Sequence, residues 1–388
     1  MKSARNRIEN IGIMIFMRQF IAVLLFTLLI CIFSAKNIHA QSKPSNTQLR
    51  IEAVVTKVIE DSQIIEDNGN KHPYQKLGLI GTSGQYKGKN LVVENGKFDQ
   101  SGVVIYKLGD SVVLSVAKDF QDHDLITITD YVRRLPLLLL FGIFIVMTII
   151  VGGLRGASSL LGMIVTFSII FLFILPQVLK GGDPVLVTIF ASLFIIPITF
   201  CLSHGLNKKT LCAVGGTLIA LLITGLLAAL FVNNTHLSGF ASEESNYLDV
   251  LKHGSINMQG LLLAGIIIGL LGVLQDITIS QAAVVYQLKN ANSKLKFHQL
   301  FTGAMDVGRD HIASMANTLI LVYAGVSLPL LLLFINNPLP FSTVINFEII
   351  AEEVVRTLVA SIGLIIAVPI TTLLTVAFVE LSSSKAKA

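Results

Sequence analysis

Long apolar runs recur along the chain after residue 134, separated by short polar segments. Each run is close to the roughly 20 residues that carry a helix across a bilayer, although the fifth is shorter. This pattern predicts an all-α bundle of about seven transmembrane helices. The runs are Leu135–Val151, Gly156–Pro176, Pro184–Leu202, Leu211–Val232, Gly260–Gln275, Ile312–Ile335 and Thr357–Val379.

Between residues 41 and 134 the pattern changes to short stretches rich in β-branched residues. "LRIEAVVTKV", "KNLVVEN", "VVIYKLGDSVVLSVAK" and "LITITDYV" are bounded by Gly, Asn and Asp, which is typical of strands and turns. We expect a separate domain of five or six strands, a small β-barrel resembling an OB-fold. Its acidic "QDHD" at 121–124 is more simply a solvated turn than a cation site.

The first 40 residues have the pattern of an export segment. Basic residues (Lys2, Arg5, Arg7 and Arg18) precede the apolar stretch Phe20–Ser34, and cleavage after Ala40 would release the rest. An uncleaved signal anchor fits the same pattern. Both alternatives place residues 41–134 outside the cytoplasm.

Composition supports a polytopic membrane protein. Hydrophobic residues make up 53% of the 388 positions and charged residues only 14%. The net charge of +5 does not indicate a nucleic-acid partner, because the basic residues lie at the ends of apolar runs. The three cysteines show no CxxC spacing, so no disulfide framework or thiolate metal site is expected.

The basic residues also predict the topology. With residues 41–134 extracytoplasmic, more Lys and Arg fall at the inner ends of the predicted helices than at the outer ends. The tail at 382–388 is then cytoplasmic. The inner residues are Arg155, Lys208, Lys209, Lys289, Lys294, Lys296, Arg309, Lys385 and Lys387, and the outer ones are Arg133, Arg134, Lys180, Lys252 and Arg356.

A polar face is predicted on the helix that contains "GAMDVGRDHIASMANTLILVYAG", residues 303–325. At 100° per residue, Asp306, Asp310 and Asn317 share one face, and Arg309 flanks it. Hydrocarbon cannot satisfy these groups, so the face should turn toward other helices or a wet cavity. The simpler alternative for Asp306 and Arg309 is an interfacial cap, and for Asn317 an interhelical hydrogen bond.

The preceding run, "GLLLAGIIIGLLGVLQDITISQAA", places a row of glycines on the same face as a carboxylate. Gly265, Gly269 and Gly272 align with Asp276, and Ser280 is close to this face. Glycines at this spacing are most simply explained by tight helix packing. An aspartate at such depth is suited to proton exchange or cation coordination, so Asp276 is the leading candidate for function.

The last run begins with an acidic and basic set at helical spacing. Glu348, Glu352 and Arg356 are four residues apart, which predicts an ion-pair stack at the outer surface. The same face continues through Gly363, a predicted packing position. Pro369 removes a backbone donor, and we expect a structural kink there or carbonyls freed toward ions or water.

Three separated stretches resemble the YibE/F-like family of bacterial multi-pass membrane proteins. They are "GLLGVLQDITISQ", "GRDHIASMANTLILVYAG" and "EEVVRTLVASIGLIIAVPITTLL", within a region of about 135–381. The resemblance implies a bacterial cytoplasmic membrane and an extracytoplasmic leading domain, but no assigned activity. It differs from the commoner family form at His311 and Ala313 and gives His311 no role. The matching positions are Asp276, Arg309, Asp310, Asn317 and Thr318.

Two functions are consistent with these patterns. One is a secondary transporter or ion-coupled permease for a small solute, with Asp276 as the coupling carboxylate and Asp310, Asn317, Arg309, Thr318 and Ser280 along the pathway. The other is a non-catalytic envelope scaffold whose β domain binds a partner protein. No phosphate-binding loop, GxSxG or HExxH pattern occurs, so we expect no enzyme, cofactor or metal. The bilayer is the partner common to both.

Overall fold

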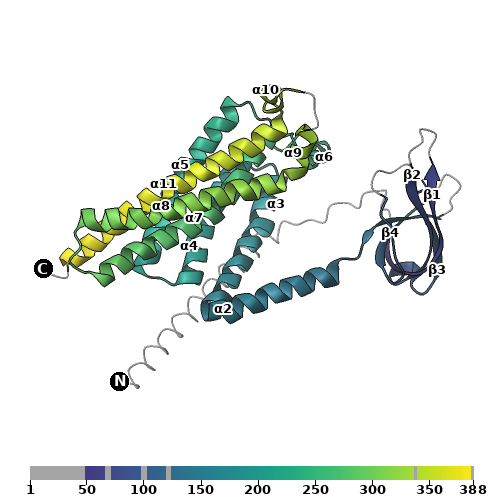
Figure 1. The fold of residues 1–388 in the computed structure, drawn as a ribbon, viewed down its shortest axis with the longest axis horizontal. Coiled ribbons are helices and arrows are strands. Elements are labelled where there is room, and N and C mark those ends of the chain that lie inside the picture. Colours follow the sequence, from purple (N-terminus) through teal and green to yellow (C-terminus); the bar gives the residue numbers. More distant parts are fainter. Residues whose placement is uncertain (1–48, 66–70, 98–102, 119–123, 336–338, 386–388) are drawn as a thin grey trace, which may run out of the picture. The chain divides into compact units, whose positions relative to one another are not determined.

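The structure is a computed structural model that describes residues 49–65, 71–97, 103–118, 124–335 and 339–385 (Figure 1). Contacts separate two compact units, with the division between Met147 and Thr148. The first unit contains all the described strands and the second most of the helices. The predicted export segment at 1–40 lies outside the described residues.

Five antiparallel strands form one sheet in the order β3-β2-β1-β4-β5. Alternate side chains of the strands point inward, and those of Ile51, Ala53 and Val55 are almost fully buried. The predicted β domain is confirmed to that extent. The strands are β1 (Leu49–Ile65), β2 (Lys71–Gly81), β3 (Asn90–Asn95), β4 (Ser111–Lys118) and β5 (Asp124–Tyr131), with a 3-10 turn, η1, at Gly84–Tyr86.

The long first strand gives the sheet its curvature. β1 pairs with β2 along most of its length and with β4 through Leu49–Val54. Its register against β2 shifts between Val55 and Lys57, and such bulges bend a strand. β3 also approaches β5, although no ladder joins these two strands in the described part of the chain. The observed element is therefore a half-open barrel, and the finer OB-fold prediction is not confirmed.

Helices make up most of the rest of the described chain (Figure 1). Several begin at side-chain caps: Asp183, Asn207 and Asn257 each accept hydrogen bonds from the first turn of the following helix. The elements are α2 (Arg134–Ile169), a π-helical turn η2 (Ile170–Ile174), α3 (Leu175–Leu179), α4 (Pro184–His204), α5 (Lys208–Asn234), α6 (Glu243–Lys252), α7 (Met258–Ala291), α8 (Phe297–Val326), α9 (Leu328–Ile335), α10 (Phe341–Val344) and α11 (Glu348–Lys385).

The number of membrane-spanning helices differs from the sequence prediction. Among the described residues, five helices are long and apolar enough to cross a bilayer, or six if α8 and α9, bent by 68°, form one broken span. The first two predicted runs lie on either side of a break in the helical segment Arg134–Leu179, where Gly153 has non-helical backbone, and the segment counts as one candidate span. The membrane character of this region is confirmed, but a count of seven is not.

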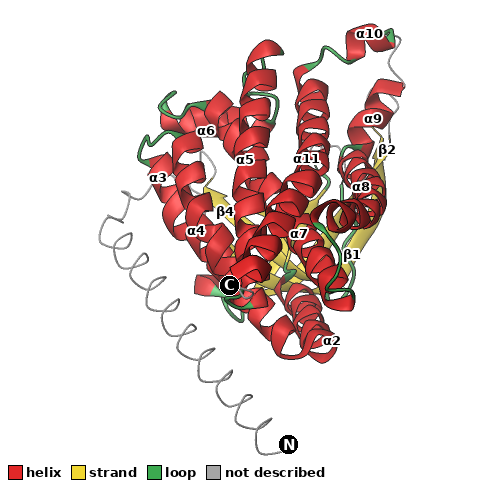
Figure 2. Cartoon of the chain, turned by 90° about the vertical axis from the view of Figure 1, so that its left-hand side faces the viewer, coloured by secondary structure: helices red, strands yellow, loops and turns green. Residues whose placement is uncertain are grey.

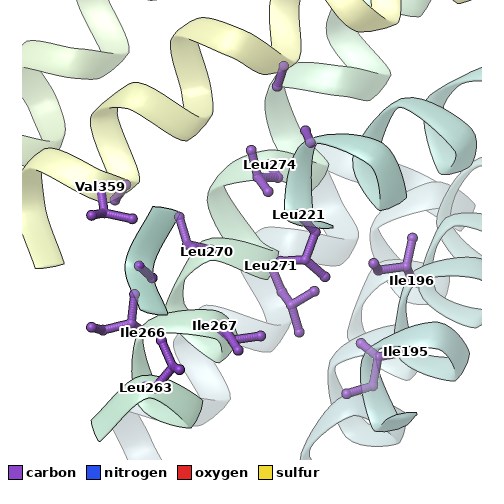
Figure 3. Packing of buried hydrophobic residues seen from close by; sticks show 14 of the residues in the cluster. Ile195, Ile196, Leu221, Leu263, Ile266, Ile267, Leu270, Leu271, Leu274 and Val359 are labelled. Atoms are coloured by element: carbon purple, nitrogen blue, oxygen red, sulfur yellow. The ribbon is translucent and has the colours of Figure 1, made fainter. Parts of the chain in front are cut away.

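α7 is the central helix of the bundle and packs against α4, α5, α8 and α11 (Figure 2). One face of α7 carries Leu263, Ile266, Ile267, Leu270, Leu271 and Leu274, all buried. Figure 3 shows them together with Ile195 and Ile196 of α4, Leu221 of α5 and Val359 of α11. Since one face of α7 is committed to this core, Gly265, Gly269, Gly272, Asp276 and Ser280 fall on an exposed face of the helix.

Candidate functional site

A pocket of about 600 Å³ surrounds the leading candidate, Asp276. Its walls come from α2, α4 and α7, which present residues three or four positions apart, as expected for single helix faces. The polar members are Arg155, Ser159, Thr166, Thr199, Ser203, His204, Gln275, Asp276 and Ser280. The structure therefore places both predicted α7 residues, Asp276 and Ser280, in one polar cavity.

The carboxylate of Asp276 has no hydrogen-bond or ion-pair partner among the described residues, and its side chain is exposed to the pocket. The neighbouring Gln275 is held differently, because its amide donates to the Thr199 hydroxyl at 2.8 Å. Thr199 in turn donates to the carbonyl of Ile195 at 2.7 Å. α4 and α7 are thus joined beside Asp276 while its carboxylate stays open to a ligand.

Two basic side chains line the same pocket. Arg155 of α2 carries a permanent charge, and His204 ends α4. Neither forms an ion pair with Asp276 within the described ranges. A carboxylate and a guanidinium that share a pocket without direct contact leave room for a solute or ion between them. The arrangement can bind a charged group and release it again as the carboxylate gains or loses a proton or cation.

The glycine face of α7 is open. A Cβ at Gly265 or Gly272 would meet nothing within 4 Å, and one at Gly269 would lie 3.9 Å from the hydroxyl of Tyr323. Glycines at this spacing commonly indicate close helix packing, but no helix among the described residues packs closely against Gly265 or Gly272. The glycines instead form a smooth exposed strip that leads along α7 to Asp276.

Close packing is found at Gly363. A Cβ there would lie 2.6 Å from Cγ2 of Thr224, so α11 and α5 approach closely at this position. Helix α11 continues through Pro369 as far as Lys385.

The α8 residues predicted to share the pathway do not reach the pocket. The side chains of Arg309, Asp310, Asn317 and Thr318 are all exposed, and none of them lines the cavity around Asp276. Arg309 pairs with Asp306 at 2.6 Å, which matches the interfacial alternative for these two residues. The structure brings Asp276 together with α2 and α4 rather than with α8.

Sequence reasoning missed a buried polar layer next to this site. Gln281 is fully buried on α7 and donates to the carbonyl of Ala304 at 2.8 Å and to the Thr372 hydroxyl at 2.7 Å. Thr217 of α5 and Thr278 of α7 share a hydrogen bond of 2.6 Å. The available signal is a glutamine five residues after Asp276, directly before the apolar residues "AAVV". These contacts fix the rotation of α7 and hence the direction of Asp276.

No group of three or more His, Cys, Asp or Glu side chains in the described part of the chain is arranged to hold a metal ion. The expectations of no metal and no cofactor stay predictions. The pocket offers one carboxyl group, one permanently charged guanidinium, one histidine and several hydroxyl and amide groups.

Comparison with known proteins gives a family for the helical region. The model of the YibE/F-like protein family matches residues 140–381, which include every residue of the pocket around Asp276. No curated protein and no solved structure matches the chain significantly. Because the match covers more than half of the sequence, the chain belongs to the YibE/F-like protein family.

Proposed function

We propose that this protein is a secondary transporter, an ion-coupled permease for a small solute, with Asp276 as the coupling carboxylate. The observation that carries the proposal is an unpartnered carboxylate in a polar pocket whose walls are candidate membrane-spanning helices. Ionisable groups in such positions are costly unless they bind something. Asp276 binds a proton or cation in one step of the cycle and gives it up in the other.

The neighbouring groups have complementary roles in this proposal. Arg155 offers a fixed positive charge to an anionic group of the solute or to the unloaded carboxylate of Asp276. Gln275 and Thr199, already bonded to each other, hold the cavity wall in place. The open strip at Gly265, Gly269 and Gly272 gives a path without bulky side chains from Asp276 toward the N-terminal end of α7. The proposal assigns no catalytic step to any residue.

We infer a bacterial cytoplasmic membrane location with residues 41–134 outside and the tail at 382–388 inside. The distribution of Lys and Arg supports this orientation. We also propose that the β unit is an OB-like barrel. β1 pairs with both β2 and β4, and β3 approaches β5, which together follow the strand neighbours of a five-stranded closed sheet.

The test is uptake by proteoliposomes containing the purified full-length protein, screened with labelled cations, amino acids and small peptides under imposed pH and sodium gradients. Wild type should accumulate at least one class of solute above empty liposomes. Asp276→Asn should lose that accumulation. Asp183→Asn is the matched control, because Asp183 caps α4 and asparagine caps a helix equally well. Equal accumulation by all three proteins would remove the coupling role.

A scaffold function is the second candidate, and a groove on the β unit favours it. The groove, about 550 Å³, lies along β3 and β5 and includes Lys76, Glu94, Lys97 and the exposed apolar side chains of Val92 and Leu125. Exposed strand edges with mixed charged and apolar side chains are suited to binding an extended peptide. On this alternative, deleting residues 41–134 abolishes function and Asp276→Asn has no effect.

A further inference from the structure

A second pocket, of about 490 Å³, lies at the N-terminal end of α7, while Asp276 is near the middle of that helix. It is formed by α6, α7, the bend between α8 and α9, and α11. Its apolar wall includes Leu261, Leu262, Val326 and Leu330, and its polar groups are Ser242, Ser245, Ser327, Glu352, Glu353 and Arg356. A cavity of this size and mixed character matches a small organic molecule better than a bare ion.

The charged groups of this pocket do not cancel. Arg356 forms an ion pair with Glu353 and lies 4.0 Å from a carboxylate oxygen of Glu352. The nearby Glu348 is satisfied elsewhere, since it accepts hydrogen bonds from the hydroxyl of Ser238 at 2.7 Å and from the backbone N–H of Gly239 at 3.0 Å. Two carboxylates facing one guanidinium leave one negative charge in the pocket.

Glu352 is the less well compensated of the two carboxylates, because Glu353 forms the closer ion pair with Arg356. Glu352 is only 9% exposed, and its Oε1 is buried without a hydrogen-bond partner. Its other oxygen, Oε2, is the one near Arg356. A buried carboxylate oxygen without a donor is costly, and a ligand that donates a hydrogen bond and carries a positive charge would relieve both deficits.

We propose that this pocket binds a small organic ammonium ion, with Glu352 as its anchor. The N–H groups of the ammonium donate to Oε1 of Glu352, and its alkyl part lies against Leu261, Leu262 and Leu330. The serine hydroxyls are additional acceptors. A cation without N–H donors can neutralise the charge, but it leaves the hydrogen-bonding need of Oε1 unmet.

The position of the pocket connects it with the site at Asp276. Gly265 lines this second pocket and lies on the same α7 face as Asp276, about 17 Å away at 1.5 Å per residue. If the ammonium ion is the transported substrate, the proposal rests on the transporter function. The pocket is then the far entrance to the glycine strip. Ammonium binding itself does not depend on transport and is measured separately.

The experiment is thermal unfolding of the detergent-solubilised full-length protein with chloride salts at equal ionic strength. n-Butylammonium should raise the unfolding temperature, while n-butyltrimethylammonium and Na⁺ should give little or no shift. Calorimetric titration should then show that Glu352→Gln binds n-butylammonium at least roughly tenfold more weakly than wild type. Glu244→Gln removes an exposed acid from α6 and is the matched control, with wild-type binding expected.

Several outcomes overturn the proposal. They are an equal shift with Na⁺, an equal shift with n-butyltrimethylammonium, no shift with any salt, or unchanged binding to Glu352→Gln. If Glu352→Gln does not fold, the comparison of the three cations on wild type still decides. Asp276→Asn should bind n-butylammonium like wild type. If n-butylammonium binds but no flux depends on Asp276, only the transporter function is contradicted. If flux depends on Asp276 but n-butylammonium does not bind, only the role of this pocket is contradicted.

Discussion

Gly308 on α8 lies directly beside the buried side chain of Gln281 on α7. A Cβ at Gly308 would lie 3.0 Å from Nε2 of Gln281 and 2.6 Å from Cγ1 of Val368 on α11. Three helices therefore meet at one point, and a glycine is what permits their approach. The contact matters for function because Gln281 fixes the rotation of the helix that carries Asp276.

Gly308→Ala is expected to destabilise the protein by about 1–3 kcal/mol, since a methyl group there overfills a packed junction. Gly303→Ala on the same helix is the control, because its Cβ would have only an ordinary contact, 3.6 Å from Leu288. The measurement is chemical or thermal unfolding in detergent. Similar stability of the two variants would show that the junction is looser than described.

The hydrogen bond between Gln281 and Thr372 should appear as a coupling energy. Gln281→Met and Thr372→Val each remove one partner with little change in volume, and a double-mutant cycle isolates their interaction. We expect about 0.6 kcal/mol and at most about 1.7 kcal/mol, the average and the maximum found by such cycles for hydrogen bonds between membrane helices. Strict additivity of the two substitutions would argue against this bond.

The break at Gly153 should require glycine. Its φ of 57° and ψ of −139° are adopted freely only by glycine, while the space around it is open. Gly153→Ala should therefore cost about 1–3 kcal/mol through backbone strain alone. Gly152→Ala is the matched neighbour, with equally open surroundings and no positive φ, and it should be neutral or stabilising. Unfolding temperatures that do not distinguish the two variants would contradict the observed break.

The β unit should show an acid-sensitive ion pair. The ammonium of Lys97, 2.7 Å from Glu94, lowers the pKa of that carboxyl below its ordinary value of 4.5, and Lys76 at 3.5 Å acts in the same direction. Because the folded pKa is the lower one, the pair adds stability above pH 4.5 and loses it as the pH falls through the folded pKa.

A carbon-13 NMR titration of glutamate carboxyls in the full-length protein measures this shift, with Glu94→Gln used to assign the resonance. Lys97→Met should move the midpoint up toward 4.5, while Lys87→Met, which changes an exposed lysine of the same unit, should leave it in place. A wild-type midpoint at or above 4.5 would count against the pair.

Much of the fold is predictable from the sequence because it depends on local periodicity. The run Pro184–Leu202 becomes α4, Pro184–His204, and Leu211–Val232 becomes the centre of α5, Lys208–Asn234. Helix caps and β-branched strands are equally local signals. The break at Gly153 falls between the predicted runs Leu135–Val151 and Gly156–Pro176, but their hydrophobicity does not indicate which glycine of "VGGLRG" carries the non-helical backbone.

The site was predictable only in part, since helical phase gives the face of a residue but not its neighbours. Asp276 and Ser280 do share a pocket, as their phase predicts. Arg155 and His204 join them through packing of α2 and α4 against α7, and no local pattern indicates that packing. Helical phase also predicts that Asp310 and Asn317 share one face of α8. The direction of that face, away from the pocket, depends on the packing of the whole bundle.

The most direct test of the central claim separates coupling from binding at Asp276. With a solute identified by the uptake screen, proteoliposomes are assayed for solute exchange at equilibrium and for accumulation driven by an imposed ion gradient. Asp276→Asn resembles a permanently neutral carboxyl, so it should retain exchange and lose gradient-driven accumulation, while Asp183→Asn keeps both. Full accumulation by Asp276→Asn would contradict the proposal that this carboxylate couples transport to an ion.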